Sequence, residues 1–253
     1  MIFNRPSRSR AKRNANPNAQ MPFVSHLAEL RHRIIVSLVA VAVAAVVAFA
    51  LFQPILNVLT GPYCDIRPPG ECTFLQTDPL EGFAIRITVS TYAGIALAMP
   101  VLLFQFWRFI TPALSSNEKR YAVPFVVAGV ILFLLGAALA FWTVPKALEF
   151  LVAIGGGSFE QRFTGSAYIS FLTKMMVGAG IGFEFPIVLI FLQIAHILHP
   201  HQLARVRRYA IVGIVTLVAV LTPSGDPFSL MILSVPMYLF FESSIVIGRF
   251  LRK

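Results

Sequence analysis

Residues 34–56 read IIVSLVAVAVAAVVAFALFQPIL, a run of mostly apolar side chains without a single charge. An apolar helix needs about 20 residues to cross a hydrocarbon core of about 30 Å, so this run is long enough for one span. Five further mostly apolar runs follow it, some of them with one or two charged residues. The sequence therefore predicts an all-α integral membrane protein with six transmembrane helices, at residues 34–56, 84–107, 121–144, 167–198, 208–222 and 228–248.

Two of the predicted spans depart from the usual length. The span at residues 167–198 is long enough to tilt or kink, and Pro186 supplies a cause for a kink. The span at residues 208–222 lies between Arg207 and Pro223, which leaves about 15 residues, or about 22 Å at 1.5 Å per residue. That length falls short of the hydrocarbon core.

The composition argues against a soluble protein. Hydrophobic residues make up 57% of the 253-residue chain and charged residues 13%, whereas soluble domains carry roughly 25% charged residues. We expect a disordered basic arm at residues 1–20, the six-helix domain at residues 21–250, and a short basic tail at residues 251–253. The first apolar run is too long for the core of a cleavable signal peptide.

The distribution of basic residues predicts the orientation. Most of the 21 Lys and Arg residues lie in the N-terminal arm and first helix approach, at residues 108–120 and 205–208, and in the tail. The loops on the other side hold only Arg67, Lys146 and Arg162. Cytoplasmic loops are enriched in Lys and Arg, so we expect both termini in the cytoplasm. The net charge of +10 is then explained by topology, without nucleic acid as a partner.

Only two acidic residues, Glu29 and Glu118, fall in the predicted cytoplasmic segments. Glu29 lies on an amphipathic segment before the first span, where it either pairs with Arg33 at i,i+4 or receives a cationic ligand. Glu118 either complements the dipole at the start of the third span or forms the second half of the same site. Two isolated carboxylates on a basic face would make a discriminating pocket for a cation.

Glu184 lies near the middle of the fourth predicted span. A carboxyl group there costs about 2.5–3.5 kcal/mol on insertion scales, so we expect a polar partner, a water-filled cavity or protonation. It is either a structural hydrogen-bonding group or a functional one. For the other charged residues in the predicted spans we expect no functional role. Arg86 and Lys174 would extend toward the outer interface, and Glu242 would snorkel or cap near the cytoplasmic end.

Cys64 and Cys72 flank a Pro- and Gly-containing turn in the first predicted outer loop. The compartment there is oxidising, so we expect a disulfide between them. The five histidines lack the spacing of a metal site, and no Walker loop, dinucleotide fingerprint or nucleophile elbow occurs. The sequence thus predicts no metal, no cofactor and no enzymatic activity.

A series of short motifs occurs in order between about residues 21 and 250. They are His26-Leu-Ala-Glu-Leu-Arg-His-Arg33, Gly61-Pro62, Pro79-Leu-Glu-Gly-Phe83, Gln105-Phe-Trp-Arg-Phe-Ile-Thr-Pro-Ala-Leu114, Glu118-Lys-Arg120, Gly182-Phe-Glu-Phe-Pro186, Leu221-Thr-Pro-Ser-Gly-Asp226, Pro236-Met-Tyr238 and Phe241-Glu242. Together they resemble the TatC family, the multi-spanning subunits of the twin-arginine protein translocase. The cysteine pair and one extra residue around Ser224 depart from the family pattern.

The resemblance implies a receptor that recognises the twin-arginine signal peptides of folded precursor proteins. It implies an oligomeric complex with TatA and TatB-like subunits in the bacterial cytoplasmic membrane, driven by the proton-motive force. By position, the signal-peptide site would comprise Glu29, Glu118, Arg31 and Phe109. Glu184 would line the concave face of a TatC-like bundle as an intramembrane polar contact, and Pro62 and Asp226 would shape the outer loops.

Two other functions are compatible with the residues taken alone. A proton-coupled transporter would use Glu184 as an intramembrane relay, although no internal repeat is visible to support it. An intramembrane hydrolase would need a nucleophile and a base in the same membrane leaflet, and the sequence offers no such pair.

Overall fold

The computed structural model describes residues 23–64, 72–110, 122–155, 163–222 and 225–251. Within these ranges the chain is helical, without a strand, and Leu75 and Thr164 form an isolated bridge. The helices are α1 (Phe23–Ala50), α2 (Phe52–Cys64), α3 (Glu81–Ile110), α4 (Ala122–Ile154), α5 (Gly165–Phe183), α6 (Phe185–Ile194), α7 (Pro200–Arg205), α8 (Arg207–Leu221) and α9 (Pro227–Leu251). The predicted all-α class is confirmed.

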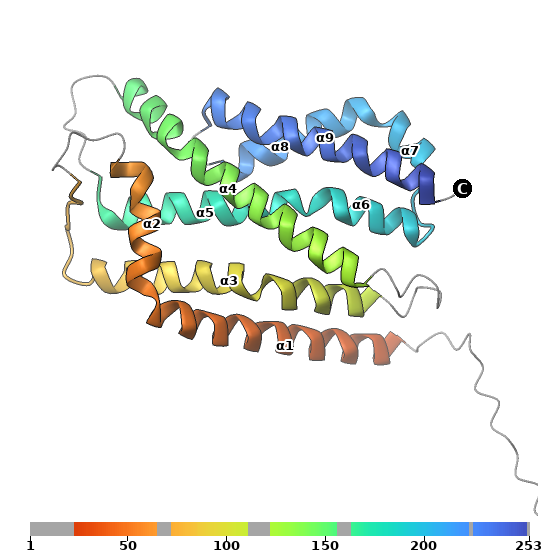
Figure 1. The fold of residues 1–253 in the computed structure, drawn as a ribbon, viewed down its shortest axis with the longest axis horizontal. Helices are drawn as coiled ribbons and strands as arrows, with labels where there is room; N and C mark the ends of the chain where they lie inside the picture. Colours follow the sequence, from red (N-terminus) through yellow and green to blue (C-terminus); the bar gives the residue numbers. More distant parts are fainter. Residues whose placement is uncertain (1–22, 65–71, 111–121, 156–162, 223–224, 252–253) are drawn as a thin grey trace, which may run out of the picture.

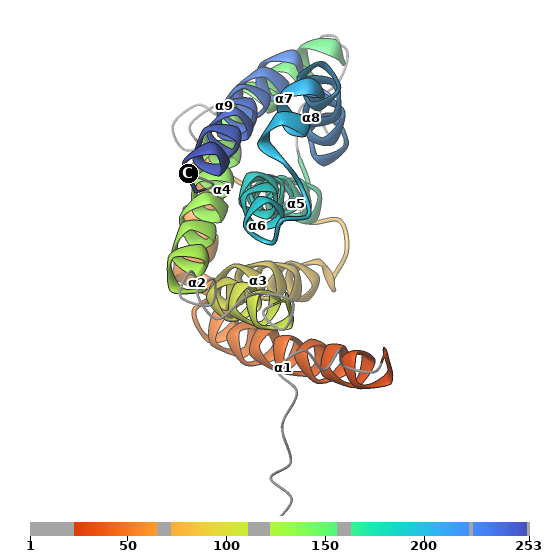
Figure 2. The same ribbon diagram turned by 90° about the vertical axis from the view of Figure 1, so that its right-hand side faces the viewer.

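The long helices run back and forth between two ends of the molecule (Figure 1). We call one of them the basic end: α1 begins there, α3 and α9 finish there, and it carries Arg31, Arg33, Arg108, Arg205, Arg207, Arg208 and Arg249. The other, which we call the opposite end, holds α2 and the beginnings of α3, α5 and α9. Seen from the basic end, α1, α3, α4 and α9 follow an arc, with α5 and α6 on its inner side (Figure 2).

Among the described residues, five helical segments are long and apolar enough to cross a membrane: Leu27–Ala50, Glu81–Phe109, Ala122–Ile154, Gly165–Ile194 and Pro227–Phe250. The remaining predicted span, at residues 208–222, coincides with α8. That helix has 15 residues, which corresponds to about 22 Å, as expected from the sequence. Five of the six predicted spans therefore meet the length and composition of a membrane helix, and α8 is shorter.

The first predicted span ends earlier than expected. The sequence predicts residues 34–56, but α1 stops at Ala50, and α2 runs in a different direction from α1 after Leu51 (Figure 1). Pro54 explains the break, because it has no N–H to donate to the main-chain oxygen of Ala50. The apolar run thus contains one long helix and the start of a second.

The helix of the fourth predicted span is interrupted near Pro186. Glu184 separates α5 from α6, and its N–H donates to the Ile181 oxygen at 3.0 Å, which tightens the last turn of α5. Pro186 follows directly in the first turn of α6 and has no N–H to continue the hydrogen-bond ladder. The helix is thus interrupted directly before Pro186, with Glu184 between the two halves, and α5 and α6 continue nearly along one line (Figure 1).

Small residues bring α4 and α5 into close contact. A Cβ atom on Gly136 would lie 2.7 Å from the Ala179 oxygen, and one on Gly180 would lie 2.6 Å from a ring carbon of Phe133. Glycine allows helix backbones to approach at such positions. The main apolar core continues from this contact through Leu172, Phe183 and Met237.

At the opposite end, aromatic rings and a disulfide fasten α2 to its neighbours. Cys64 and Cys72 are joined by a disulfide, with their Cα atoms 5.0 Å apart. Tyr63 stacks on Phe74 with ring centroids 4.5 Å apart. The Tyr168 hydroxyl on α5 donates to the Leu59 oxygen on α2 at 2.8 Å.

A carboxylate adds a second fastening at the opposite end. Oε1 of Glu81 accepts hydrogen bonds from the Ser166 N–H at 2.9 Å and the Ser166 hydroxyl at 2.7 Å, while Oε2 accepts from the Thr77 N–H at 2.9 Å. One side chain therefore joins the start of α3, the preceding segment and the start of α5.

The two residues expected to shape outer loops also lie at the opposite end. Pro62 is buried within α2. Asp226 is fully buried and accepts a 2.6 Å hydrogen bond from the Ser229 N–H at the start of α9. Gly225 precedes it with a φ of +59°, a backbone conformation that glycine adopts without strain.

Candidate ligand-binding site

Glu29 lies near the beginning of α1 and binds a guanidinium group of the same helix. Oε1 of Glu29 is 2.7 Å from Nη2 of Arg33, one helical turn further along. The side chains are 20% and 14% exposed, so the pair is largely but not completely shielded from solvent. The i,i+4 pairing that the spacing allowed is therefore present.

A glutamine from α3 holds the same arginine. Nη1 of Arg33 donates to Oε1 of Gln105 at 3.1 Å, so the guanidinium bridges α1 and α3. The register of the two helices explains the meeting. Gly94 on α3 packs directly on Ala45 on α1, because a Cβ on Gly94 would come within 2.7 Å of the Ala45 backbone. Gln105 follows Gly94 on α3 by nearly the same number of residues as Arg33 precedes Ala45 on α1. Because the two helices are antiparallel, both residues lie on the same side of this contact.

The last turn of α3 is anchored by Trp107. This side chain is 2% exposed, and its ring lies 4.8 Å from that of Phe125 on α4 and 5.7 Å from that of Phe191 on α6. The anchored turn fixes the position of Gln105 and of the half-buried Phe109. Sequence reasoning did not assign a role to Gln105 or Trp107, although both stand in the motif that begins at residue 105.

The structure places the other predicted site residues as follows. Arg31 is exposed on α1 beside the Glu29–Arg33 pair in sequence, and Phe109 is at the end of α3, so both lie at the basic end. Glu118 falls at residues 111–121, outside the described residues. Glu184 lies between α5 and α6, whose junction is away from the ends of the long helices (Figure 1).

The Glu184 carboxyl group is enclosed between helices. The residue is 9% exposed, and a Cβ on Gly129 of α4 would lie 3.0 Å and 3.4 Å from its two oxygens. Neither oxygen has a hydrogen-bond partner among the described residues. The structural hydrogen bond to a neighbouring helix, one of the two readings of the sequence, is therefore not seen in the described part of the chain.

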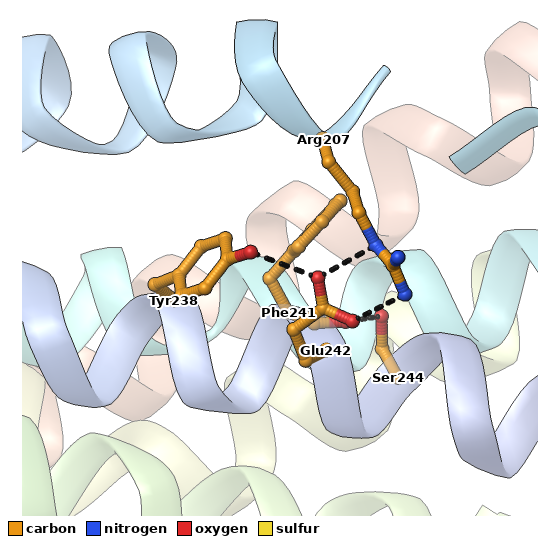
Figure 3. A network of polar contacts seen from close by, with 5 residues as sticks. All are labelled: Arg207, Tyr238, Phe241, Glu242 and Ser244. Carbon is orange, nitrogen blue, oxygen red and sulfur yellow. Dashed lines mark hydrogen bonds and ion pairs between the residues drawn. The ribbon is translucent and has the colours of Figure 1, made fainter. Parts of the chain in front are cut away.

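Glu242 on α9 forms a polar cluster with α8 (Figure 3). Its two oxygens each lie 2.8 Å from a nitrogen of Arg207, Oε1 from Nε and Oε2 from Nη2, and the Tyr238 hydroxyl donates to Oε1 at 3.0 Å. We expected Glu242 to snorkel or cap. Instead it accepts a bidentate guanidinium contact that holds the first turn of α8 against α9.

Arg86 also departs from expectation. Rather than extending toward an interface, it turns toward the end of α1 and donates from Nη2 to the Phe49 oxygen at 3.2 Å. Its guanidinium carbon lies 4.1 Å from the centre of the Phe49 ring and 5.3 Å from that of Phe52. The break between α1 and α2 leaves carbonyl groups without helical partners, and Arg86 satisfies one of them.

These arrangements suit binding rather than bond-making. Within the described ranges, no group of three or more His, Cys, Asp or Glu side chains could hold a metal ion. What the basic end offers is a carboxylate that accepts a guanidinium, among many cationic side chains.

Residues 25–236 match the family model described as Sec-independent protein translocase protein (TatC). The chain belongs to the TatC family. A relative of that name from Aquifex aeolicus is 38% identical over 235 residues, covering 90% of this chain and 95% of the relative. One from Frankia casuarinae is 36% identical and covers 91% of this chain, which spans 66% of that relative's length.

A solved structure described as the twin arginine translocase receptor TatC has a TM-score of 0.74 and 37% sequence identity to this chain, covering 90% of this chain and 100% of that one. This TatC chain is accordingly a membrane protein of a protein translocase family that serves protein transport. The family does not favour the proton-coupled transporter. The matched segment contains Glu29, Glu118 and Glu184 but ends before Tyr238 and Glu242.

Proposed function

We propose that this TatC protein is the receptor that binds the consecutive arginines of twin-arginine signal peptides on folded precursors. Glu29 and Glu118 would receive the two guanidinium groups, with Arg31 and Phe109 at the edge of the site. The observation that supports this most directly is the 2.7 Å contact between Glu29 and a guanidinium group at the basic end.

The chemistry of this contact favours arginine over lysine. A guanidinium presents parallel N–H groups that match the two oxygens of a carboxylate, whereas an ammonium is a compact point charge. The surrounding arginines repel weakly bound cations and leave few positions where a positive charge is welcome. The protein would present two carboxylates, and a ligand with two adjacent guanidinium groups would pair with both.

The proposal includes the setting of the protein. The basic end would face the cytoplasm of a bacterium, both termini would be cytoplasmic, and α8 would serve as a short sixth span, in line with the positive-inside rule. TatA and TatB-like subunits would assemble with this protein in an oligomeric complex that uses the proton-motive force. Glu184 would offer its enclosed carboxyl group to such a partner or to the inserted signal peptide.

Binding of synthetic signal peptides to the full-length protein in lipid nanodiscs tests the proposal. Glu29→Ala and Glu118→Ala should each weaken binding of an Arg-Arg peptide. Loss of an exposed ion pair costs under about 1 kcal/mol and loss of a well-desolvated one about 2–5 kcal/mol. Since Glu29 is mostly shielded, we expect a loss of at least about fivefold.

Two controls accompany this measurement. Glu149→Ala removes an exposed carboxylate that pairs with Lys146 on α4, and it should leave peptide affinity unchanged. A Lys-Lys peptide should bind weakly to the unmodified protein and lose less in both variants. Unchanged Arg-Arg binding in Glu29→Ala and Glu118→Ala, with correct membrane insertion, would refute the assignment.

A further inference from the structure

The carboxylate proposed to bind a signal-peptide arginine is already bound to an arginine of its own helix. Arg33 contacts Glu29 at 2.7 Å and is held in place by Gln105 at 3.1 Å. Its Nε atom is buried and has no hydrogen-bond partner among the described residues. Arg33 therefore makes only part of the contacts that a guanidinium can make.

We propose that Arg33 is an internal competitor of the signal-peptide arginine, occupying Glu29 at rest and leaving it when the peptide binds. This inference rests on the proposed function and adds a regulatory element to the same site. The exchange replaces one guanidinium–carboxylate contact by another, so the carboxylate is not left unpaired in either state.

Arg33 belongs to none of the apolar core clusters of the described residues. It belongs to α1, most of whose apolar span is exposed, and it makes a hydrogen bond to Gln105 on α3 at 3.1 Å. By contrast Arg86, the other arginine that bridges α1 and α3, is stacked on two phenylalanine rings and bonded to the main chain. Arg33 is thus suited to exchange, and Arg86 to fixed support.

Competition of this kind has a quantitative signature. A site that is open only part of the time shows an affinity reduced by its open fraction, whatever the ligand. Removing Arg33 should therefore raise the affinities of the Arg-Arg and the Lys-Lys peptide by the same factor and leave their ratio unchanged. A partly exposed i,i+4 ion pair supports a factor of about two to five.

The opposite role makes the opposite prediction. If Arg33 instead holds Glu29 in the orientation that the peptide needs, its removal should weaken peptide binding. Arg33 would then be a support of the site, and the competition would not exist.

The experiment measures peptide dissociation constants with the full-length protein in nanodiscs at fixed ionic strength. In Arg33→Met, both peptides should bind about two- to fivefold more tightly with an unchanged ratio. Gln105→Met keeps the charge of Arg33 and removes only the hydrogen bond that holds it. It should therefore raise the affinity of both peptides by a smaller factor than Arg33→Met does. Weaker or unchanged binding in Arg33→Met would overturn the inference.

Two further variants separate contact from general charge and from failure of the proposed function. Arg108→Gln removes an exposed cation from the last turn of α3 and should tighten binding less than Arg33→Met; an equal gain would overturn the competition. In a Glu29→Ala background, Arg33→Met should increase peptide affinity by no more than Arg108→Gln does. If Glu29→Ala alone leaves affinity unchanged, the proposed site fails; if it weakens affinity while Arg33→Met does not strengthen it, only the competitor role fails.

Discussion

Arg86 on α3 donates a 3.2 Å hydrogen bond to the main-chain oxygen of Phe49 in the last turn of α1. The guanidinium lies over the Phe49 ring as well, so one side chain supports both the backbone and the aromatic surface where α1 gives way to α2. A positive charge at the C-terminal end of a helix also complements its dipole. This contact explains how the chain can turn at Leu51 without leaving the end of α1 unsupported.

We expect Arg86→Met to destabilise the protein. The substitution leaves the partly buried Phe49 oxygen without its donor, and a fully buried unsatisfied acceptor costs about 1–3 kcal/mol, which sets the upper bound here. Thermal unfolding of the purified protein in one detergent should show a lower Tm. Lys174→Met, which removes an exposed cation from α5, is the matched control and should change the Tm little. Equal behaviour of the two variants would show that Arg86 has no structural role.

Gly136→Ala should destabilise the α4–α5 contact. Its Cβ would lie 2.7 Å from the Ala179 oxygen, a backbone atom that cannot move aside as a flexible side chain can. Overpacking of this kind costs about 1–3 kcal/mol. Gly213→Ala on α8 serves as control, because a Cβ there meets nothing within 4 Å and alanine favours the helix. The prediction fails if Gly136→Ala matches or exceeds Gly213→Ala in Tm.

Two substitutions at Glu184 distinguish a polar contact from a proton carrier. If the carboxyl group offers a hydrogen bond to a partner, Glu184→Gln should largely retain complex assembly and export, while Glu184→Leu should impair both. A group that must gain and lose a proton would be disabled equally by the two changes. Export of a twin-arginine precursor at matched expression measures this. Wild-type activity of Glu184→Leu would remove Glu184 from the functional site.

The disulfide between Cys64 and Cys72 should be present in native membranes. Thiol labelling before and after reduction, read by mass spectrometry, should show both cysteines protected until the reductant is added. Cys64→Ser should lower the free energy of unfolding by about 2–3 kcal/mol, the amount expected for a short closed loop. Complete labelling of both thiols without reductant would exclude the bond.

Local patterns in the sequence predicted much of the fold. The helix class, the interruption before Pro186 and the short α8 all follow from the placement of apolar runs and prolines along the chain. The pairing of Glu29 with Arg33 was one of two alternatives, because i,i+4 spacing shows that a contact is possible but not which partner a carboxylate prefers. The end of α1 was misplaced because the apolar run continues through Pro54 without a change in hydropathy.

The contacts that the sequence did not predict join residues far apart along the chain. Arg207 and Glu242 are separated by the whole of α8 and most of α9, and no local pattern tells that their helices meet at those positions. Gln105 and Arg33 likewise depend on the register set by Gly94 and Ala45. Glu118 remains a prediction from the sequence and the family.

The fastening of the opposite end determines how these helices can move. The disulfide, the Tyr63–Phe74 stack and the hydrogen bonds to Glu81 lie far from Glu29, so separation of the helices there would break many contacts together. The easiest relative motion is then a rotation about that end. α3 has 30 residues and is about 45 Å long, so each degree of rotation shifts its last turn by about 0.8 Å. Gln105 lies about 36 Å from the start of α3, so a rotation of a few degrees would shift it by about 2 Å, enough to break its hydrogen bond to Arg33.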